Sequence, residues 1–189
     1  MDLTEYVKDR VTLGRFAHSQ RVAKQAMLLA KKHNIDIDVA YKAGIAHDCC
    51  RELTGKELLS LAEHYGIVAD EYEQDWPLGL HGKVAAKFLE EEFLLSEEIK
   101  EAIAYHVTGH PNMGKLARII YLADKIEEGR SYPGVEKIRE IAETDLNGAL
   151  LIAIDSAFNY LINKRLPIHP DSLALRNSLL LKHKSGNKL

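Results

Sequence analysis

The sequence has no long apolar run and very few cysteines. No apolar stretch approaches the roughly 20 residues that a helix needs to cross a bilayer, and residues 1–5 do not resemble a signal peptide. Its two cysteines, Cys49 and Cys50, are neighbours, so they give neither a disulfide framework nor a spaced thiolate pair for structural zinc. We therefore expect a protein of the reducing cytoplasm, in which both cysteines are small apolar residues and no membrane is a partner.

Neither sign of charge dominates the chain. The formal net charge is −3, with 28% charged and 46% hydrophobic residues, which is the composition of an ordinary globular protein. Such a balance gives no general attraction for nucleic acid, so we expect no nucleic-acid partner. The length of 189 residues suits one domain with a sizeable core. We assign residues 1–182 to that domain and residues 183–189 to a polar C-terminal tail.

Helical periodicity fills the chain, and no segment shows the alternation of a strand. Between residues 12 and 33, for example, Val22, Ala26, Leu29 and Ala30 recur three and four positions apart. Capping signals predict further helix starts at Asp36 or Asp38, at Thr54 and at Ser96. Further helices are predicted over residues 2–10, 78–91, 115–127, 135–142 and 145–165 and from Pro170, with an acidic, aromatic loop over 70–77. The sequence predicts an all-α, single-domain protein.

The pair His47-Asp48 follows a run of small and apolar residues over 39–46 that is typical of a buried helix. A carboxylate buried there costs several kcal/mol unless a cation meets it. A divalent metal would supply that cation. The dipeptide alone is weak evidence, because such pairs arise by chance.

Four other polar residues lie on apolar faces of separate predicted helices, namely His18, His81, His106 and Asp124. Each alone is more often a hydrogen-bonded core residue than a ligand. Burying all of them without a common partner would cost about 1–3 kcal/mol apiece, and a shared metal removes most of that cost. We predict His18, His47, Asp48 and Asp124 as ligands, a set that suits iron or manganese better than structural zinc.

His81 and His106 have two alternative roles. They could complete a second metal position with Asp48 as a bridge, or contact substrate phosphates, since His81 lies in the first turn of its helix. Asp48, His81 or His106 could also transfer a proton. Candidate phosphate clamps are Arg51, Lys83 and Arg130, although each could instead be a solvated surface cation.

Several motifs together resemble the HD-type metal-dependent phosphohydrolases, and more closely the YqeK-type symmetrical diadenosine tetraphosphatases. They are RFAHS at 15–19, GIAHD at 44–48, HGKVAA at 81–86, AYH at 104–106, ADKIE at 123–127, IHP at 168–170 and Arg176-Asn177. The resemblance covers about residues 1–182 and implies an HD-type helical bundle, iron as the metal, and cleavage of diadenosine tetraphosphate into two ADP. It also favours contacts to the nucleotide from Ile168, His169 and Arg176, beside those expected from His18 and Asp124.

The residues themselves indicate only that a metal-bound water or hydroxide attacks phosphorus in an ester or anhydride. An HD-type nucleotidase or phosphodiesterase acting on other nucleotides is one alternative function. A module that binds a nucleotide polyphosphate without turnover is another, but no ligand is missing from the set. A purely structural protein would leave the inward-facing polar residues unexplained. The sequence is compatible with one or two metal ions in the site and with a homodimer.

Overall fold

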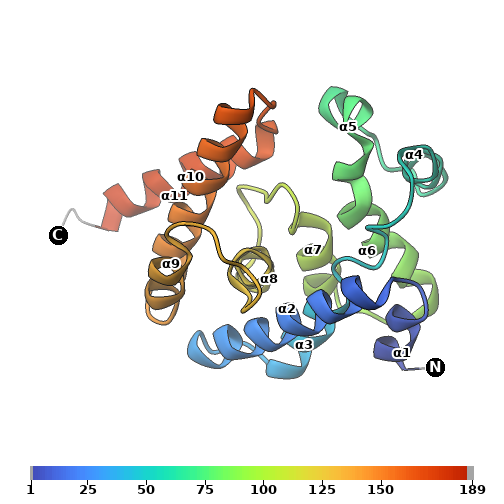
Figure 1. Cartoon of the computed structure of the whole chain (residues 1–189), viewed down its shortest axis with the longest axis horizontal. Coiled ribbons are helices and arrows are strands. Elements are labelled where there is room, and N and C mark those ends of the chain that lie inside the picture. Colours follow the sequence, from blue (N-terminus) through green and yellow to red (C-terminus); the bar gives the residue numbers. More distant parts are fainter. Residues whose placement is uncertain (1, 187–189) are drawn as a thin grey trace.

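The computed structural model describes the backbone of residues 2–186 and the side chains of residues 2–181. These residues form helices and connecting turns without a strand, so the predicted all-α fold is confirmed (Figure 1). The helices are α1 Leu3–Lys8, α2 Leu13–Lys32, α3 Ile37–Ala46, α4 Gly55–His64, α5 Glu71–Asp75, η1 Pro77–Leu80, α6 His81–Glu92, α7 Glu97–Tyr105, α8 Lys115–Ile126, α9 Val135–Ala142, α10 Leu146–Lys164 and α11 Pro170–Gly186.

The helix starts follow the capping residues of the sequence. The Thr12 hydroxyl accepts from the Arg15 amide at the start of α2, and the Asp36 carboxylate accepts from two amides at the start of α3. Thr54 and Glu57 form the predicted capping box of α4. Gly66, just after α4, has a φ of +66°, the left-handed conformation that glycine adopts readily at a helix end.

Helix α8 lies in the middle of the molecule and carries a nearly continuous buried surface. It packs against α2, α3 and α7 on one side and against α9 and α10 on the other (Figure 1). Helices α2 and α3 pack most extensively against each other, because Gly44 lets the two backbones approach closely. This arrangement brings the polar residues of α2, α3, α7 and α8 to one place.

The predicted loop over residues 70–77 is wrong, because this segment contains α5 and the first residue of η1. The Asp70 side chain accepts from the Glu73 amide while the Glu73 side chain accepts from the Asp70 amide, which caps α5. A helix of five residues is too short to show a 3.6-residue repeat. The predicted helix over 78–91 accordingly divides into η1 and α6, which leaves His81 at the first position of α6.

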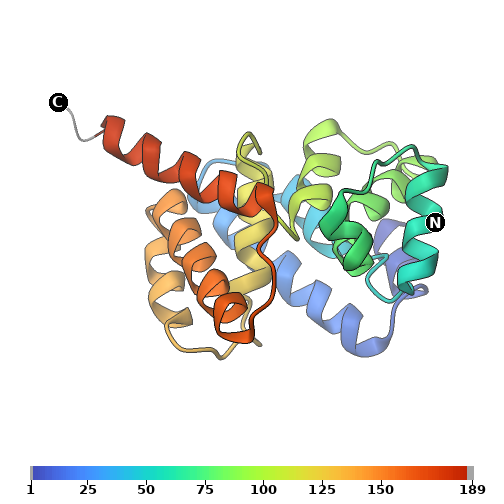
Figure 2. The same cartoon turned by 90° about the horizontal axis from the view of Figure 1, so that it is seen from above.

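The C-terminal helices cover the other side of α8. Helix α11 crosses α10, and its far end projects beyond the body of the molecule (Figure 2). Its backbone is helical as far as Gly186, and the rest of the tail predicted over 183–189 lies outside the described residues. Within the described residues, no helix is long and apolar enough to span a membrane.

Candidate metal centre

Three histidines of the site lie at helix ends, where each ring is fixed by its own backbone. His47 follows α3, His106 follows α7, and His81 joins η1 to α6. In each ring Nδ1 lies 2.6–2.7 Å from the carbonyl oxygen three residues earlier, that of Gly44, Leu78 or Ile103. A carbonyl only accepts, and carbonyls near helix ends have spare capacity. Each Nδ1 therefore carries the proton, and each Nε2 presents a lone pair to the interior.

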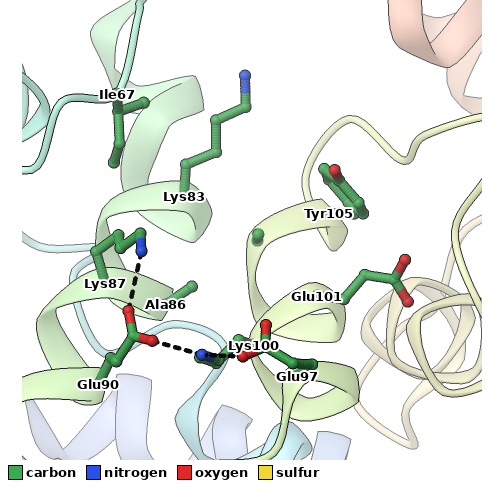
Figure 3. A pocket seen from close by; sticks show the side chains of 10 residues that line it. Ile67, Lys83, Ala86, Lys87, Glu90, Glu97, Lys100, Glu101 and Tyr105 are labelled. Carbon is green, nitrogen blue, oxygen red and sulfur yellow. Dashed lines mark hydrogen bonds and ion pairs between the residues drawn. The ribbon is translucent and has the colours of Figure 1, made fainter.

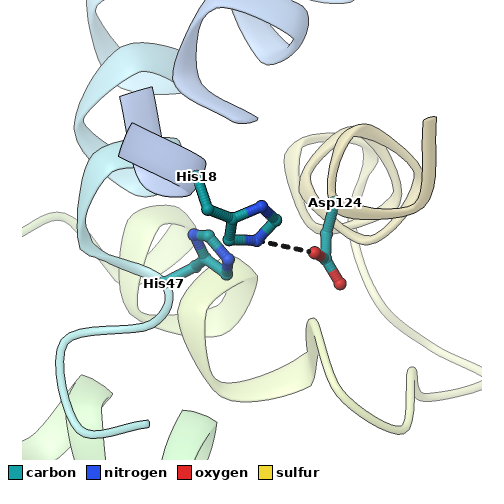
Figure 4. A group of neighbouring side chains, drawn as sticks. All are labelled: His18, His47 and Asp124. Carbon is teal, nitrogen blue, oxygen red and sulfur yellow. Dashed lines mark ion pairs between the residues drawn. The ribbon is translucent and has the colours of Figure 1, made fainter. Parts of the chain in front are cut away.

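His18 reaches the same interior from the middle of α2. Its Nε2 lies 3.1 Å from Asp124 Oδ1 (Figure 4). Its Nδ1 lies 3.3 Å from Glu127 Oε1. The Nδ1–Glu127 contact has hydrogen-bond geometry and Nε2 makes no hydrogen bond to any described residue, so Nδ1 carries the proton and the Nε2 lone pair lies near the Asp124 carboxylate. Two acceptors at this distance repel each other unless a cation lies beside both.

The Asp48 carboxylate occupies the centre of the cluster. Its Oδ1 lies 3.1 Å from His81 Nε2 and 3.4 Å from His106 Nε2, and its Oδ2 lies 3.5 Å from His47 Nε2. Burial raises the pKa of the Asp48 carboxyl, but His47 and the close contacts with His106 and His81 lower it by more, so the net pKa is well below its usual range. Asp48 is therefore an anion, and the Arg15 guanidinium donates to it at 2.7 Å.

The pKa of the Asp124 carboxyl is also held well below its usual range. Burial raises it, and the polar and positively charged surroundings, Lys125 first and Arg130 among them, outweigh that effect. The centre thus contains two ionised carboxylates, Asp48 and Asp124, among imidazole lone pairs.

These residues fit a divalent cation. The buried Nε2 atoms of His18 and His47 have no hydrogen-bond partner. Two overlapping groups place all their ligand atoms within 4.8 Å of one another: His18, His47 and Asp124, and His47, Asp48 and His106. In addition, His81 Nε2 and His106 Nε2 lie 3.0 Å apart although both Nδ1 protons are already donated. A cation between these lone pairs and carboxylates would satisfy all of them.

Comparison with known proteins identifies the family. A model of the HD domain matches residues 15–129, which contain all six of these histidines and aspartates. The chain belongs to the HD domain family. We call the six residues, His18, His47, Asp48, His81, His106 and Asp124, the HD centre.

Relatives of known name cover nearly the whole chain. One from Halalkalibacterium halodurans is 38% identical over 95% of this chain and 96% of its own. One from Bacillus subtilis is 34% identical over 92% of this chain and 94% of its own. Both are symmetrical bis(5'-nucleosyl)-tetraphosphatases by name. A crystal structure from Clostridium acetobutylicum, described as an HD superfamily hydrolase involved in NAD metabolism, has a TM-score of 0.89 at 32% identity and covers 95% of this chain and 96% of that one.

Among the predicted phosphate clamps, only the Arg130 side chain forms a hydrogen bond or ion pair with the HD centre within the described part of the chain. The Arg130 guanidinium donates to Asp124 Oδ1 at 2.7 Å and to the Asp124 carbonyl at 2.8 Å. Arg51 follows in the turn after Asp48, where its amide donates to the Asp48 carbonyl; no ion pair of its side chain occurs among the described residues. Lys83 pairs with Glu73 at 2.7 Å instead.

His169 forms a separate contact with α5. Its Nδ1 accepts from the Asp171 amide at 3.1 Å, so its Nε2 carries the proton and faces Asp70 Oδ2 at 2.9 Å. This is the opposite tautomer to that of the HD centre. Ligand atoms of Asp70, Glu73 and His169 lie within 4.8 Å of one another. Each carboxylate already has a partner, because the proton on His169 Nε2 faces Asp70 and the Lys83 ammonium pairs with Glu73. The contact is a link between α5 and the segment before α11.

Arg176 and Ile168, two other residues expected to contact the nucleotide, lie in the C-terminal part of the chain. Arg176 donates to Asp155 at 2.5 Å, which ties α11 to α10. Ile168 is partly buried against the main hydrophobic core. Neither interaction joins the HD centre, so their roles stay predictions.

A groove of about 380 Å³ lies between α6 and α7 (Figure 3). Each of its three lysines is already paired: Lys87 with Glu90, Lys100 with Glu90 and Glu97, and Lys83 with Glu73. A phosphate in the groove would therefore have to compete with a carboxylate for each of these lysines.

Sequence reasoning missed Arg15, Arg21 and Glu127 as parts of the site. Arg15 binds Asp48, while Arg21 donates to Glu127 at 2.7 Å. The signal was present: Arg15 and Arg21 lie three positions on either side of His18, and Glu127 lies three after Asp124. This spacing puts each of them close to the face of its helix that carries the site residue.

The buried His47 predicts a pH dependence of stability in the metal-free protein. Burial lowers its pKa to about 4, while the unfolded ring keeps the ordinary value of 6.5. Between pH 6.5 and 4 the unfolded state therefore binds the proton that the folded state does not, and stability falls as the pH falls. We expect a loss of about 1.4 kcal/mol per pH unit from this group. Urea unfolding of chelator-treated protein at several pH values measures this loss. In His47→Gln the free energy of unfolding should fall less steeply with falling pH, by the contribution of one bound proton.

Proposed function

We propose that this chain hydrolyses diadenosine tetraphosphate symmetrically to two ADP, using a divalent metal held by the HD centre. The observation that carries the proposal is the set of four buried imidazoles whose Nε2 lone pairs converge on two carboxylates. The relatives named symmetrical bis(5'-nucleosyl)-tetraphosphatases, matched over nearly their full length, supply the substrate class.

His18, His47, Asp48 and Asp124 are the proposed ligands, two neutral imidazoles and two carboxylates. A divalent ion in this set would offset charge on phosphoryl oxygens and acidify a bound water. Neither candidate ligand group among the described residues contains a cysteine, although Cys49 follows Asp48 directly. Nitrogen and oxygen ligands without thiolate favour iron or manganese, and we propose iron.

The remaining residues of the centre would bind and orient the polyphosphate. Arg130 is 41% exposed and Arg15 is 29% exposed, so each guanidinium can turn part of its fork toward phosphate oxygens while it holds a carboxylate. His81 and His106 face the same space and would contact phosphate or complete a second metal position. Asp48, His81 or His106 would accept or donate the proton when water adds across the central anhydride.

Residues outside the centre would hold the rest of the dinucleotide. We retain His169, Arg176, Ile168, Lys83 and Arg51 as proposed contacts to phosphate, sugar or base. Lys83 and His169 belong to the contact beside α5, which a bound nucleotide would have to rearrange to use them. A cytoplasmic location, a homodimer and the absence of a nucleic-acid partner stay predictions of the sequence.

Product analysis tests the function. Incubation of metal-loaded protein with diadenosine tetraphosphate in ¹⁸O-water should give ADP alone. Attack at a phosphorus of the central anhydride puts one labelled oxygen on the terminal phosphate of one of the two ADP molecules. Chromatography with mass spectrometry measures both. Formation of ATP with AMP, or no turnover with iron or manganese, would refute the proposal.

A further inference from the structure

We propose that Glu127 is the positioning residue that makes His18 a metal ligand, by fixing which nitrogen of its ring carries the proton. This inference rests on the metal centre of the proposed function. It concerns Glu127, the residue directly after α8, acting on a ring of α2, and it starts from a difference among the four histidines.

His18 cannot be oriented as the other three are. His47, His81 and His106 stand at helix ends and donate Nδ1–H to a carbonyl three residues back. His18 lies inside α2, where the carbonyls of the preceding turn accept helical amides. No neighbouring backbone group of α2 sets its tautomer. The ring needs an acceptor from elsewhere in the fold, and Glu127 supplies it at 3.3 Å.

Glu127 is itself held firmly. It is only 2% exposed, at the end of α8, and its Oε2 accepts from Arg21 Nε at 2.7 Å and from the Gly129 amide. With two donors on Oε2, Oε1 remains to accept from His18; the Arg130 guanidinium lies 3.8 Å from Oε1, beyond hydrogen-bond distance. A carboxylate has no hydrogen to donate, so the proton that Glu127 accepts lies on Nδ1. Among the described residues His18 Nε2 makes no hydrogen bond, although Asp124 Oδ1 lies 3.1 Å away, and its lone pair is left for a metal. Carboxylates that orient a ligating histidine in this way tune metal affinity.

The variant Glu127→Gln tests this with almost no change of shape. The amide has one accepting end and one donating end, while Arg21 and Gly129 together present two donors. The oxygen should turn to those donors, so that the amide NH₂ faces His18 Nδ1. The ring then accepts at Nδ1 and carries its proton on Nε2, which removes the lone pair that would bind metal.

Two measurements follow. In metal-free protein, ¹⁵N spectra of the imidazoles should show His18 protonated on Nδ1 in the native sequence and on Nε2 in Glu127→Gln, with its signal assigned by loss in His18→Gln. Titration with Mn²⁺ should give a dissociation constant about 10–100-fold weaker in Glu127→Gln, the usual effect of losing such a partner. Glu127→Ala, which removes the acceptor, should weaken Mn²⁺ binding similarly and leave both tautomers populated.

Glu128→Gln is the matched control. Glu128 is the next residue and also pairs with α2, through Lys24 at 3.0 Å, but both side chains are exposed. It should leave the His18 spectrum and Mn²⁺ binding unchanged. An unchanged His18 tautomer with native Mn²⁺ affinity in Glu127→Gln would overturn the inference. Because the spectra use neither nucleotide nor metal, a failure to hydrolyse diadenosine tetraphosphate would refute the proposed function and leave this result standing.

Discussion

Replacing His47 with alanine is expected to abolish metal binding and to lower the rate of dinucleotide hydrolysis by more than about 100-fold. His47 belongs to both candidate ligand groups, and its Nε2 is buried without another partner. Loss of a residue that merely orients a ligand costs about 10–100-fold in metal affinity or activity, so loss of a shared ligand should cost more. Metal analysis of protein purified without chelator, together with initial rates, measures both effects.

The effect of the same variant on folding separates ligand loss from misfolding. Without metal, His47→Ala should unfold at a lower temperature than the native chain, because the buried ring and its hydrogen bond to the Gly44 carbonyl are lost, and removal of the orphaned Nε2 offsets only part of that cost. With Mn²⁺ at 100 times its dissociation constant, the native protein should gain about 2.7 kcal/mol and the variant nothing. His64→Ala, at an exposed histidine of α4, is the control. A His47→Ala protein that keeps metal and activity would contradict the proposed centre.

Gly44→Ala is expected to cost about 1–3 kcal/mol of folding stability or more, the range for overpacking a tight core. An added Cβ would lie 2.6 Å from Ala23 Cα and 3.0 Å from Ala23 N. These are backbone atoms of α2, so the two helices would have to move apart. His47 follows directly after α3, three residues beyond Gly44, and α2 carries His18 five residues before Ala23, so metal affinity should fall as well. Denaturant unfolding and Mn²⁺ titration give the two quantities.

Gly14→Ala is the matched control for this prediction. Gly14 also lies in a helix, at the start of α2, but an added Cβ would meet nothing within 4 Å. Alanine is the better helix former by about 0.5–1 kcal/mol, so this variant should be more stable than the native chain. A stable, fully metal-binding Gly44→Ala protein would show that the α2–α3 contact does not set the geometry of the centre.

The fold followed from the sequence wherever local chemistry determines it. Thr12, Asp36 and Thr54 mark helix starts because their side chains bind amides only a few residues away. Helix α5 escaped prediction because its stability comes from its cap and from burial of Glu73 beneath Lys83, a tertiary contact. A segment of five residues is too short to show a helical periodicity in its sequence.

The six residues of the HD centre could be predicted because each occupies a place that an apolar side chain would otherwise fill. The supporting residues could not be predicted in this way. Arg15, Arg21 and Glu127 are charged residues at ordinary helical spacing, and a sequence does not distinguish a carboxylate that meets a buried imidazole from one that meets solvent. Lys83 is the opposite case. It was predicted as a phosphate clamp, but it pairs with Glu73 of α5, a helix that the sequence did not predict.

Helices α2 and α8 meet at the centre although 106 residues separate Arg21 from Glu127. A growing polypeptide therefore has only part of the coordination sphere until α8 has been synthesised and docked. An ion would bind the finished fold much more strongly than any earlier fragment, and by mass action it would draw late folding steps toward completion. Metal supply would then act on how much folded protein accumulates, and not solely on how fast each molecule turns over.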